Sequence, residues 1–288
     1  MSLGWNIAGK TVLVTGGTSG IGYATAMELA DQGATVFITS RSQRSADSAA
    51  GALSRTTKVP VRGLELDLSR LGSVRSFADK FAQDSTSLDV LVNNAGTISG
   101  RRTLTEDGLE LTFAANFLGP FLLTQLLLPK LMSAASARIL NVSSELYRNA
   151  KKGLDFSNLQ LNRGFSSSKA YANSKLAIML FTSELQDRLA GEHVTALALH
   201  PGVVRTNFGS GPDSSRSMAL MMKLLGPMLK SPEEGAATTI HLATAPLEVL
   251  HKSWYWSEGK PAEPTALALD PEAGARLWHM SEELVSSF

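Results

Sequence analysis

Tyr171 and Lys175 stand four residues apart in the segment YANSK, inside a stretch with a helical pattern. On a helix, this spacing places both side chains on one face. A free tyrosine has a pKa of ~10, which is too high for an efficient base near neutral pH. A neighbouring ammonium group favours the phenolate, so we expect Lys175 to lower the pKa of Tyr171. The pair could then exchange a proton with a carbonyl or alcohol, although the same spacing is more common on solvated helix faces.

A glycine-rich turn, TGGTSGIG, lies near the start of the chain, between a β-branched run and a helical pattern. Glycines let the backbone turn sharply and approach a pyrophosphate closely. Free N–H groups at the start of the helix then face the anion, and the helix dipole assists. Many such turns are only tight loops, but a position between strand and helix favours a dinucleotide site. The expected cofactor-binding residues are Gly16, Gly17, Thr18, Ser19, Gly20, Ile21 and Gly22.

Arg41 bears on which dinucleotide would bind. A fold that binds NAD usually places an Asp or Glu about 20 residues past the glycines, on the ribose 2′-hydroxyl. Here that position reads TSRS, with Arg41 and no carboxylate. A guanidinium presents a fixed fork of donors that suits a 2′-phosphate. An ordinary solvated arginine is the alternative, but the missing acid and the arginine together favour NADP(H).

Alternating strands and helices must position these motifs. The predicted strands are Thr11–Thr15, Thr35–Ser40, Val61–Asp67, Leu88–Asn93, Arg138–Ser143 and Val194–His200, with a short last strand at Trp254–Trp256. Helical patterns cover Ile21–Gln32, 44–54, 70–83, 107–132, 167–190 and Pro271–Val285. Nearly continuous apolar strands separated by helices indicate a parallel sheet covered on both faces. We therefore expect an α/β fold: a single-domain Rossmann-type doubly wound parallel sheet flanked by helices, over residues 1–288.

A loop-like stretch, Gly209–Ser217, follows the sixth predicted strand and leads into the Met-rich segment Met218–Leu229. Ligands of such sheets bind at the carboxyl ends of the strands. The two segments are therefore predicted to form a substrate lid at about 205–230, with a surface loop and an ordinary packed helix as the alternative. Because Met adapts to irregular apolar shapes, the lid favours a hydrophobic substrate.

Composition narrows the function classes. The net charge is +1, from 27 basic and 26 acidic residues, so nucleic acid or an anionic membrane surface is not an expected partner. Without cysteine there are no disulfides or thiolate metal sites, and the five histidines lack metal-ligand spacing, so no metal is expected. No signal peptide is recognisable, and no uninterrupted apolar run approaches the roughly 20 residues of a membrane span. We expect a cytoplasmic protein without a membrane anchor, and homo-oligomerisation stays open.

The motifs together resemble the short-chain dehydrogenase/reductase family. Its order of motifs is present: the T-G-x-x-x-G-x-G turn, N-N-A-G after the fourth strand, a serine after the fifth, Y-x-x-x-K, and a P-G turn after the sixth. The local text GLDFSNLQ, YANSKL, HPGVVRT and SPEEGAA is similar to the retinol-dehydrogenase-like subgroup. The resemblance covers nearly the whole chain. Many proteins of that subgroup carry an N-terminal membrane anchor, which this sequence does not show.

The resemblance implies roles for further residues. Ser144 would hydrogen-bond the substrate oxygen, Asn116 would help to hold a proton-relay water, and Lys175 would also contact the nicotinamide ribose. On pattern alone, Ser144 suits a cap and Asn116 a helix kink. Further cofactor contacts implied by the family are Asp67, Leu68, Asn94, Ala95, Gly96, Pro201, Gly202, Val203 and Thr206, besides Tyr171 and Lys175. An Asp at position 67 also suits a helix N-cap, and N-N-A-G also suits a simple turn.

The expected function is an oxidoreductase that transfers a hydride between NADP(H) and a hydrophobic carbonyl or alcohol. Tyr171 would serve as the general acid and base, with Asn116, Ser144 and Lys175 completing the catalytic set. The alternative is an NADP(H)-binding sensor or scaffold of the same fold without turnover. A protein that only binds the cofactor has no physical need for Ser144, Tyr171 and Lys175 together.

Overall fold

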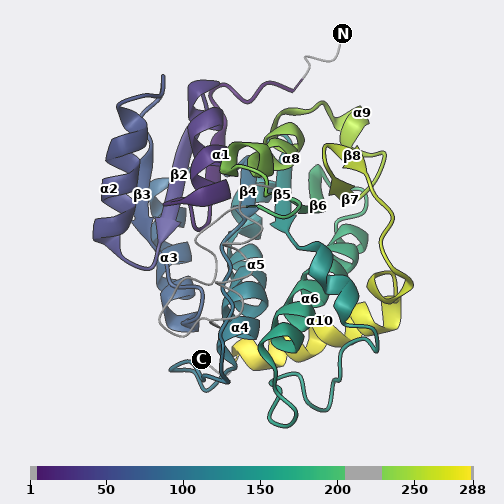
Figure 1. Ribbon diagram of the computed structural model, residues 1–288. Helices are drawn as coiled ribbons and strands as arrows, with labels where there is room; N and C mark the ends of the chain where they lie inside the picture. The colour runs from purple at the N-terminus through teal and green to yellow at the C-terminus, as the bar shows by residue number, and fades with distance from the viewer. Residues whose placement is uncertain (1–4, 205–228, 287–288) are drawn as a thin grey trace.

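The structure is a computed structural model, and it describes residues 5–204 and 229–286. Within these ranges the chain forms one eight-stranded sheet in the order β3-β2-β1-β4-β5-β6-β7-β8 (Figure 1). Neighbouring strands are parallel except for β7 and β8. The strands are β1 (Thr11–Val14), β2 (Thr35–Ser40), β3 (Arg62–Glu65), β4 (Val90–Asn93), β5 (Ala137–Val142), β6 (Val194–His200), β7 (Tyr255–Ser257) and β8 (Lys260–Pro261). The strand order reverses direction between β1 and β4, so the predicted doubly wound α/β fold is confirmed.

Helices cover both faces of the sheet. One face carries α1 (Gly20–Asp31), α2 (Gln43–Ser54), α8 (Pro232–Thr244) and α9 (Leu247–Leu250). The opposite face carries α3 (Leu71–Asp84), α4 (Leu111–Phe113), α5 (Gly119–Met132), α6 (Ser167–Arg188) and α10 (Pro271–Ser286). Three short helical turns complete the described elements: the π-helical η1 (Ala114–Leu118) and the 3-10 helices η2 (Glu145–Asn149) and η4 (Ala266–Ala268).

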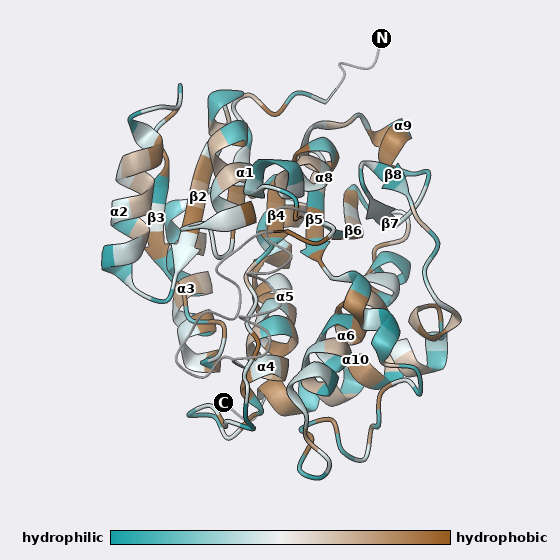
Figure 2. Cartoon of the chain, viewed as in Figure 1, coloured by the Kyte–Doolittle hydropathy of each residue, from teal (hydrophilic) through white to brown (hydrophobic). Residues whose placement is uncertain are grey.

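The strands separate two hydrophobic clusters. In β1, Val12 and Val14 pack into the cluster beneath α1 and α8, whereas Leu13 packs into the cluster beneath α5 and α6. Successive strand residues point to opposite faces, so an unbroken apolar run fills both layers. Figure 2 shows the resulting hydrophobic colouring of the central strands. The edge strand β3 is shorter than predicted and has no fully buried residue, because only one side of it is paired.

The predicted helix at 107–132 begins later than the sequence indicates. Glu110 ends the preceding loop, pairs with Leu104 in an isolated bridge, and accepts the free N–H groups of Thr112 and Phe113 at the helix start. The helix then runs from Leu111 to Met132, through the π-helical turn η1.

This helix corrects one sequence-based expectation. It is 22 residues long and contains an 18-residue window with a mean hydropathy of 1.6, which is enough by length and composition to cross a membrane. The expectation that no apolar segment approaches that length is therefore wrong for the helix as it forms. Pro120 directly follows the π-helical turn η1, and Pro129 is accommodated inside α5. Of the apolar window, 72% is buried inside the protein, as in a helix that packs in a core.

The C-terminal part contains elements that sequence patterns did not resolve. The predicted strand Trp254–Trp256 is displaced by one residue, to Tyr255–Ser257, and turns back through Gly259 into β8, which was not predicted. Helix α8 begins with a capping box, in which Ser231 and Glu234 satisfy each other's backbone N–H groups. Residues 205–228 of the predicted lid lie outside the described residues.

Candidate active site

The carboxyl ends of β1 to β6 place the predicted motifs along one edge of the sheet. These six strands are parallel, so the loops that follow them leave on the same side. Read in sheet order from β3 to β6, the edge carries Asp67, Arg41, the glycine turn at 16–22, Asn94–Gly96, Ser144 and Pro201–Val203. Residues from six separate parts of the sequence therefore form one row, crossing the switch point between β1 and β4 where such folds bind ligands.

Asn94 and Thr15 hold the glycine turn in shape. The Asn94 side chain donates to the carbonyl oxygens of Thr15 at 2.8 Å and of Gly16 at 3.3 Å. The Thr15 hydroxyl accepts the backbone N–H groups of both Asn94 and Ala95, each at 3.0 Å. The side-chain amide of Asn94 is therefore committed to the turn, and this residue shapes the binding loop as well as lying beside it.

The turn leaves no room for side chains where a dinucleotide would approach. A Cβ added to Gly22 would lie 2.4 Å from the Gly16 carbonyl oxygen and 2.5 Å from Asn94 Nδ2. Gly16 and Gly20 have φ angles of +66° and +55°, a region that favours glycine. Ser19 precedes α1 without a side-chain capping bond. The first N–H groups of a helix have no partner within the helix, so those at the start of α1 are the groups that could bind a pyrophosphate.

Three predicted contacts lie further along the row. Arg41 is exposed directly after β2, next to the helix start of α2. The Asp67 carboxylate accepts both the backbone N–H and the hydroxyl of Ser69, at 2.9 and 2.6 Å. Asp67 is not a helix N-cap, because α3 begins at Leu71. The Leu68 side chain is buried in the core, so only its backbone could contact a ligand.

Ser144 and Tyr171 meet at the carboxyl end of β5. Ser144 is the N-cap of η2, and its hydroxyl accepts the N–H of Leu146 at 3.3 Å. Its side chain also hydrogen-bonds the phenol of Tyr171, which stands in the first turns of α6. A hydroxyl and a phenol that share a hydrogen bond can both contact one oxygen atom of a small molecule.

Lys175 lies one turn after Tyr171 and is almost fully buried. Its Nζ donates to the carbonyl oxygen of Val142 at 2.8 Å and lies 5.7 Å from the centre of the Tyr171 ring. The Ser143 hydroxyl in turn donates to the backbone carbonyl of Lys175 at 3.1 Å. These contacts join α6 to the end of β5 and hold the ammonium group beneath the phenol.

Burial determines the proton affinities of both groups. It raises the pKa of Tyr171 to about 12, and the hydrogen bond from Ser144 offsets only part of this rise. It lowers the pKa of Lys175 to about 8. The expectation that Lys175 lowers the pKa of Tyr171 below its ordinary value is therefore wrong for the protein as described. The ammonium group donates to the Val142 carbonyl, and the loss of hydration around the phenol is the largest cause of the raised pKa of Tyr171.

Asn116 lies in the π-helical turn η1 and is buried. Its side-chain oxygen accepts the N–H of Thr97 at 2.7 Å, while its amide donates to the Thr97 carbonyl at 2.9 Å and to the Ser174 hydroxyl at 3.0 Å. Ser174 is the neighbour of Lys175 in α6. The side chain therefore links the loop after β4 to the helix that carries Tyr171.

The turn after β6 closes the row. Gly202 has a φ of +80°, and Val203 is 64% exposed. Lys230, at the return of the chain, donates its N–H to the Val203 carbonyl at 3.0 Å. Thr206, the remaining predicted cofactor contact, lies outside the described residues. Pro201 and Gly202 are partly exposed at the same edge as Ser144.

Sequence reasoning missed residues whose partners are remote in the chain. Thr15 begins the TGGTSGIG motif but is not among the predicted site residues, yet its hydroxyl organises the glycine turn. Asn93 donates to Asn141 and Thr124, and Asn141 donates to Thr182, so buried side chains tie β4 and β5 to α5 and α6. A buried polar residue in an apolar strand is the one sequence signal that could have indicated such a network.

Comparisons with known proteins agree with this geometry. A family model described as short chain dehydrogenase matches residues 10–215. Human retinol dehydrogenase 14 is 41% identical over 292 residues, covering 96% of this chain and 86% of that protein. Human retinol dehydrogenase 13 is 41% identical over 286 residues, covering 97% and 85%.

Solved structures share the fold. The crystal structure of an uncharacterised protein from Mycobacterium paratuberculosis has a TM-score of 0.75 and 35% identity, covering 98% of both chains. A metagenomic short-chain oxidoreductase in complex with NADP has a TM-score of 0.64 and 21% identity, covering 90% of this chain and 99% of that one. At that identity the second comparison concerns the fold alone.

Proposed function

The chain belongs to the short-chain dehydrogenase/reductase family of oxidoreductases, and we propose that it interconverts a hydrophobic carbonyl compound and its alcohol with NADP(H). The observation that carries the proposal is the Ser144–Tyr171 hydrogen bond beside the buried ammonium of Lys175, at the same sheet edge as the glycine turn. When bound, a nicotinamide dinucleotide supplies or accepts the hydride.

Tyr171 and Ser144 perform the proton chemistry in this proposal. With its pKa raised to about 12, Tyr171 keeps its proton at neutral pH and can donate it to the oxygen of a carbonyl that is being reduced. Ser144 donates a second hydrogen bond to the same oxygen and stabilises its developing negative charge. Lys175 lies directly beneath and favours the phenolate that remains. Reduction is the direction that this protonation state favours.

Arg41 supports NADP(H) rather than NAD(H). It is exposed at the end of β2, the position from which an acidic residue would contact a ribose 2′-hydroxyl. From Ser40 to Arg44 the chain carries two arginines and no carboxylate. A 2′-phosphate would find a bidentate donor there, and a free 2′-hydroxyl would find no acceptor of matching charge.

Apolar side chains support a hydrophobic substrate. Leu146 and Val203 are exposed, at 46% and 64%, on the turns that follow Ser144 and Pro201. The relatives at 41% identity are named retinol dehydrogenases, so a long apolar aldehyde or alcohol of the retinoid kind is the substrate class proposed. The exposed side chains would be shielded from water by such a substrate.

NADPH consumption tests the proposal. The purified protein is offered all-trans-retinal, medium-chain aldehydes and ketones, with NADPH and NADH in parallel, and Tyr171→Phe is compared with the wild type. We expect turnover with NADPH and an apolar aldehyde, and a fall of about 10²- to 10⁴-fold in the variant. Tight NADPH binding without turnover, unchanged by Tyr171→Phe, would instead support a cofactor-binding sensor or scaffold.

A further inference from the structure

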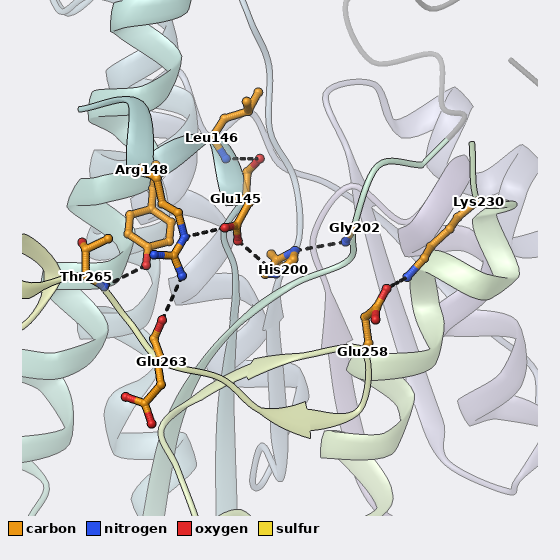
Figure 3. A network of polar contacts seen from close by, with 11 residues as sticks. Glu145, Leu146, Arg148, His200, Gly202, Lys230, Glu258, Glu263 and Thr265 are labelled. Carbon is orange, nitrogen blue, oxygen red and sulfur yellow. Dashed lines mark hydrogen bonds and ion pairs between the residues drawn. The ribbon is translucent and has the colours of Figure 1, made fainter. Parts of the chain in front are cut away.

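His200 ends β6 and contacts two turns of the site. Its Nε2 lies 3.2 Å from a carboxylate oxygen of Glu145, the first residue of η2. The backbone N–H of Gly202 donates to its Nδ1 at 3.2 Å. Figure 3 shows the imidazole between these two partners. The ring therefore connects the segment that begins at Ser144 to the turn that carries Pro201 and Gly202.

The two contacts determine the tautomer of the ring. A backbone N–H can only donate, so Nδ1 must present its lone pair to Gly202. In a neutral imidazole the proton then resides on Nε2, where it faces the Glu145 carboxylate. Both contacts are satisfied only by the neutral ring with its proton on Nε2. Protonation would keep the contact with Glu145, but it would place two donors face to face at Gly202.

We propose that His200 is a positioning residue that, as the neutral Nε2–H tautomer, sets the distance between the Ser144 segment and the Gly202 turn. This inference rests on the proposed function, because those segments are the ones assigned to the substrate oxygen and to the cofactor. The hydrogen bond to Glu145 holds η2, whose N-cap is Ser144. The hydrogen bond from the Gly202 N–H restrains the backbone at Gly202, which has a φ of +80°. Glycine has no side chain that could restrain this conformation.

The surroundings of the ring favour this state. Burial lowers the pKa of His200, with further lowering by Lys230 and Arg148, against opposing contributions from Glu145 and Glu258. On the remaining side the ring packs against Tyr255, with centres 6.0 Å apart. Glu145 is itself held by an ion pair with Arg148, whose guanidinium also donates to the Glu263 carbonyl at 2.9 Å. The acceptor of the Nε2 proton is therefore paired with Arg148, which is itself bound to the Glu263 carbonyl (Figure 3).

Two amide substitutions separate the contacts. In His200→Asn, the side-chain oxygen keeps the place of Nδ1 and can accept from Gly202, but the side chain is too short for Glu145. In His200→Gln, the amide nitrogen keeps the place of Nε2 and can donate to Glu145, but no acceptor remains for Gly202. His279→Asn is the matched control, because His279 pairs with Glu283 on the exposed face of α10.

We expect a crossed kinetic pattern. His200→Asn should lower kcat by roughly three- to tenfold while the KM for NADPH stays within about twofold. His200→Gln should raise the KM for NADPH by roughly three- to tenfold while kcat stays within about twofold. The control should match the wild type. The positioning role would be overturned if both variants changed the same parameter equally, or if neither variant changed kcat or KM. A residue with a merely structural role would not affect kcat in one variant and KM in the other.

An activity-free measurement covers the case in which no substrate is found. Imidazole ¹⁵N NMR at neutral pH, with the His200 signals identified by their loss in His200→Asn, should show a bare Nδ1 and a protonated Nε2. A protonated Nδ1 would overturn the inference even in an active enzyme. NADP⁺ affinity measured by calorimetry between about pH 5 and 7 should fall more steeply toward acid in the wild type than in His200→Asn, whose oxygen does not titrate. Equal pH dependence would also overturn it. If the tautomer is as inferred and no carbonyl is turned over, only the proposed function fails.

Discussion

The Nζ of Lys175 donates to the backbone carbonyl of Val142 at 2.8 Å, and this bond ties helix α6 to the end of strand β5. The ammonium group is nearly excluded from water and has a neutral oxygen as its partner, which explains the lowered pKa of about 8. A buried charge without an anionic partner costs stability. The buried Lys175 therefore lowers the stability of the fold, and its charge serves the proposed chemistry.

Lys175→Met tests this interpretation. We expect the variant to be more stable than the wild type at pH 7 by about 1–3 kcal/mol. The lowered pKa of Lys175 corresponds to a burial cost of about 3 kcal/mol, which the variant does not have. The Val142 carbonyl loses its hydrogen bond in the variant, and this loss offsets part of the gain. A lowered lysine pKa means that the unfolded chain binds more protons between about pH 8 and 10.5, so wild-type stability rises across that window. The difference in stability between the variant and the wild type should therefore decrease between about pH 8 and 10.5. Urea unfolding at pH 7 and 10 measures it.

Lys169→Met is the control for this experiment, since Lys169 is exposed on the same helix. It should change stability by less than about 0.5 kcal/mol at either pH. A Lys175→Met protein that is less stable than the wild type at pH 7 would contradict the burial penalty. Activity should be lost in Lys175→Met and retained in Lys169→Met.

Ser144→Ala should shift the pH dependence of alcohol oxidation. The Ser144 hydrogen bond lowers the pKa of Tyr171, so its removal raises that pKa further above its ordinary value. Oxidation needs the phenolate, and its rate should rise with pH along a limb that moves to higher pH in the variant. Carbonyl reduction uses the phenol, so its rate should fall without a shift of its pH profile between about pH 6 and 9. Rate profiles in both directions provide the measurement, and a limb that moves toward lower pH would refute the assignment.

Much of the fold follows from the sequence because its signals are local. The buried strand TVFITS and the glycines after TVLVT specify their own conformations, and both form within a residue of their predicted bounds. The helix predicted at 107–132 was placed less well at its start. Glu110 caps the helix and also pairs with Leu104 in an antiparallel bridge across a short loop, which the helical pattern of the sequence does not indicate.

The site divides in the same way. The glycine turn and the Tyr171–Lys175 spacing can be predicted from residues that are close in the sequence. The pKa of Tyr171 instead depends on its burial in the folded protein. Considering only the charge four residues away gave the wrong direction, because burial is a property of the packed structure. Asn116 illustrates the same limit: its amide contacts Ser174, which is 58 residues away in the sequence.

Arg41→Ala should discriminate between the two dinucleotides. If Arg41 binds the 2′-phosphate, the variant loses roughly 10- to 100-fold in NADPH affinity, the effect of a charge-assisted hydrogen bond, with little change for NADH. Arg55→Ala, on an exposed arginine at the far end of α2, is the matched control and should leave both affinities unchanged. Fluorescence titration gives both dissociation constants. An equal loss for NADPH and NADH would remove the argument for the 2′-phosphate.

Gly22→Ala and Gly72→Ala compare two glycines that lie in the first turns of helices. At Gly22 the new methyl group would lie 2.4 Å from a backbone oxygen of the turn and 2.5 Å from Asn94, so the cradle must open. We expect a loss of about 1–3 kcal/mol in stability, the usual cost of overpacking, together with weaker NADPH binding. At Gly72 nothing lies within 4 Å, so alanine should stabilise α3 by about 0.5–1 kcal/mol and leave binding unchanged. Thermal unfolding and NADPH titration of both variants separate helix propensity from the shape of the cradle. If Gly22→Ala bound NADPH as the wild type does, close backbone approach at this turn could not be the reason for its glycines.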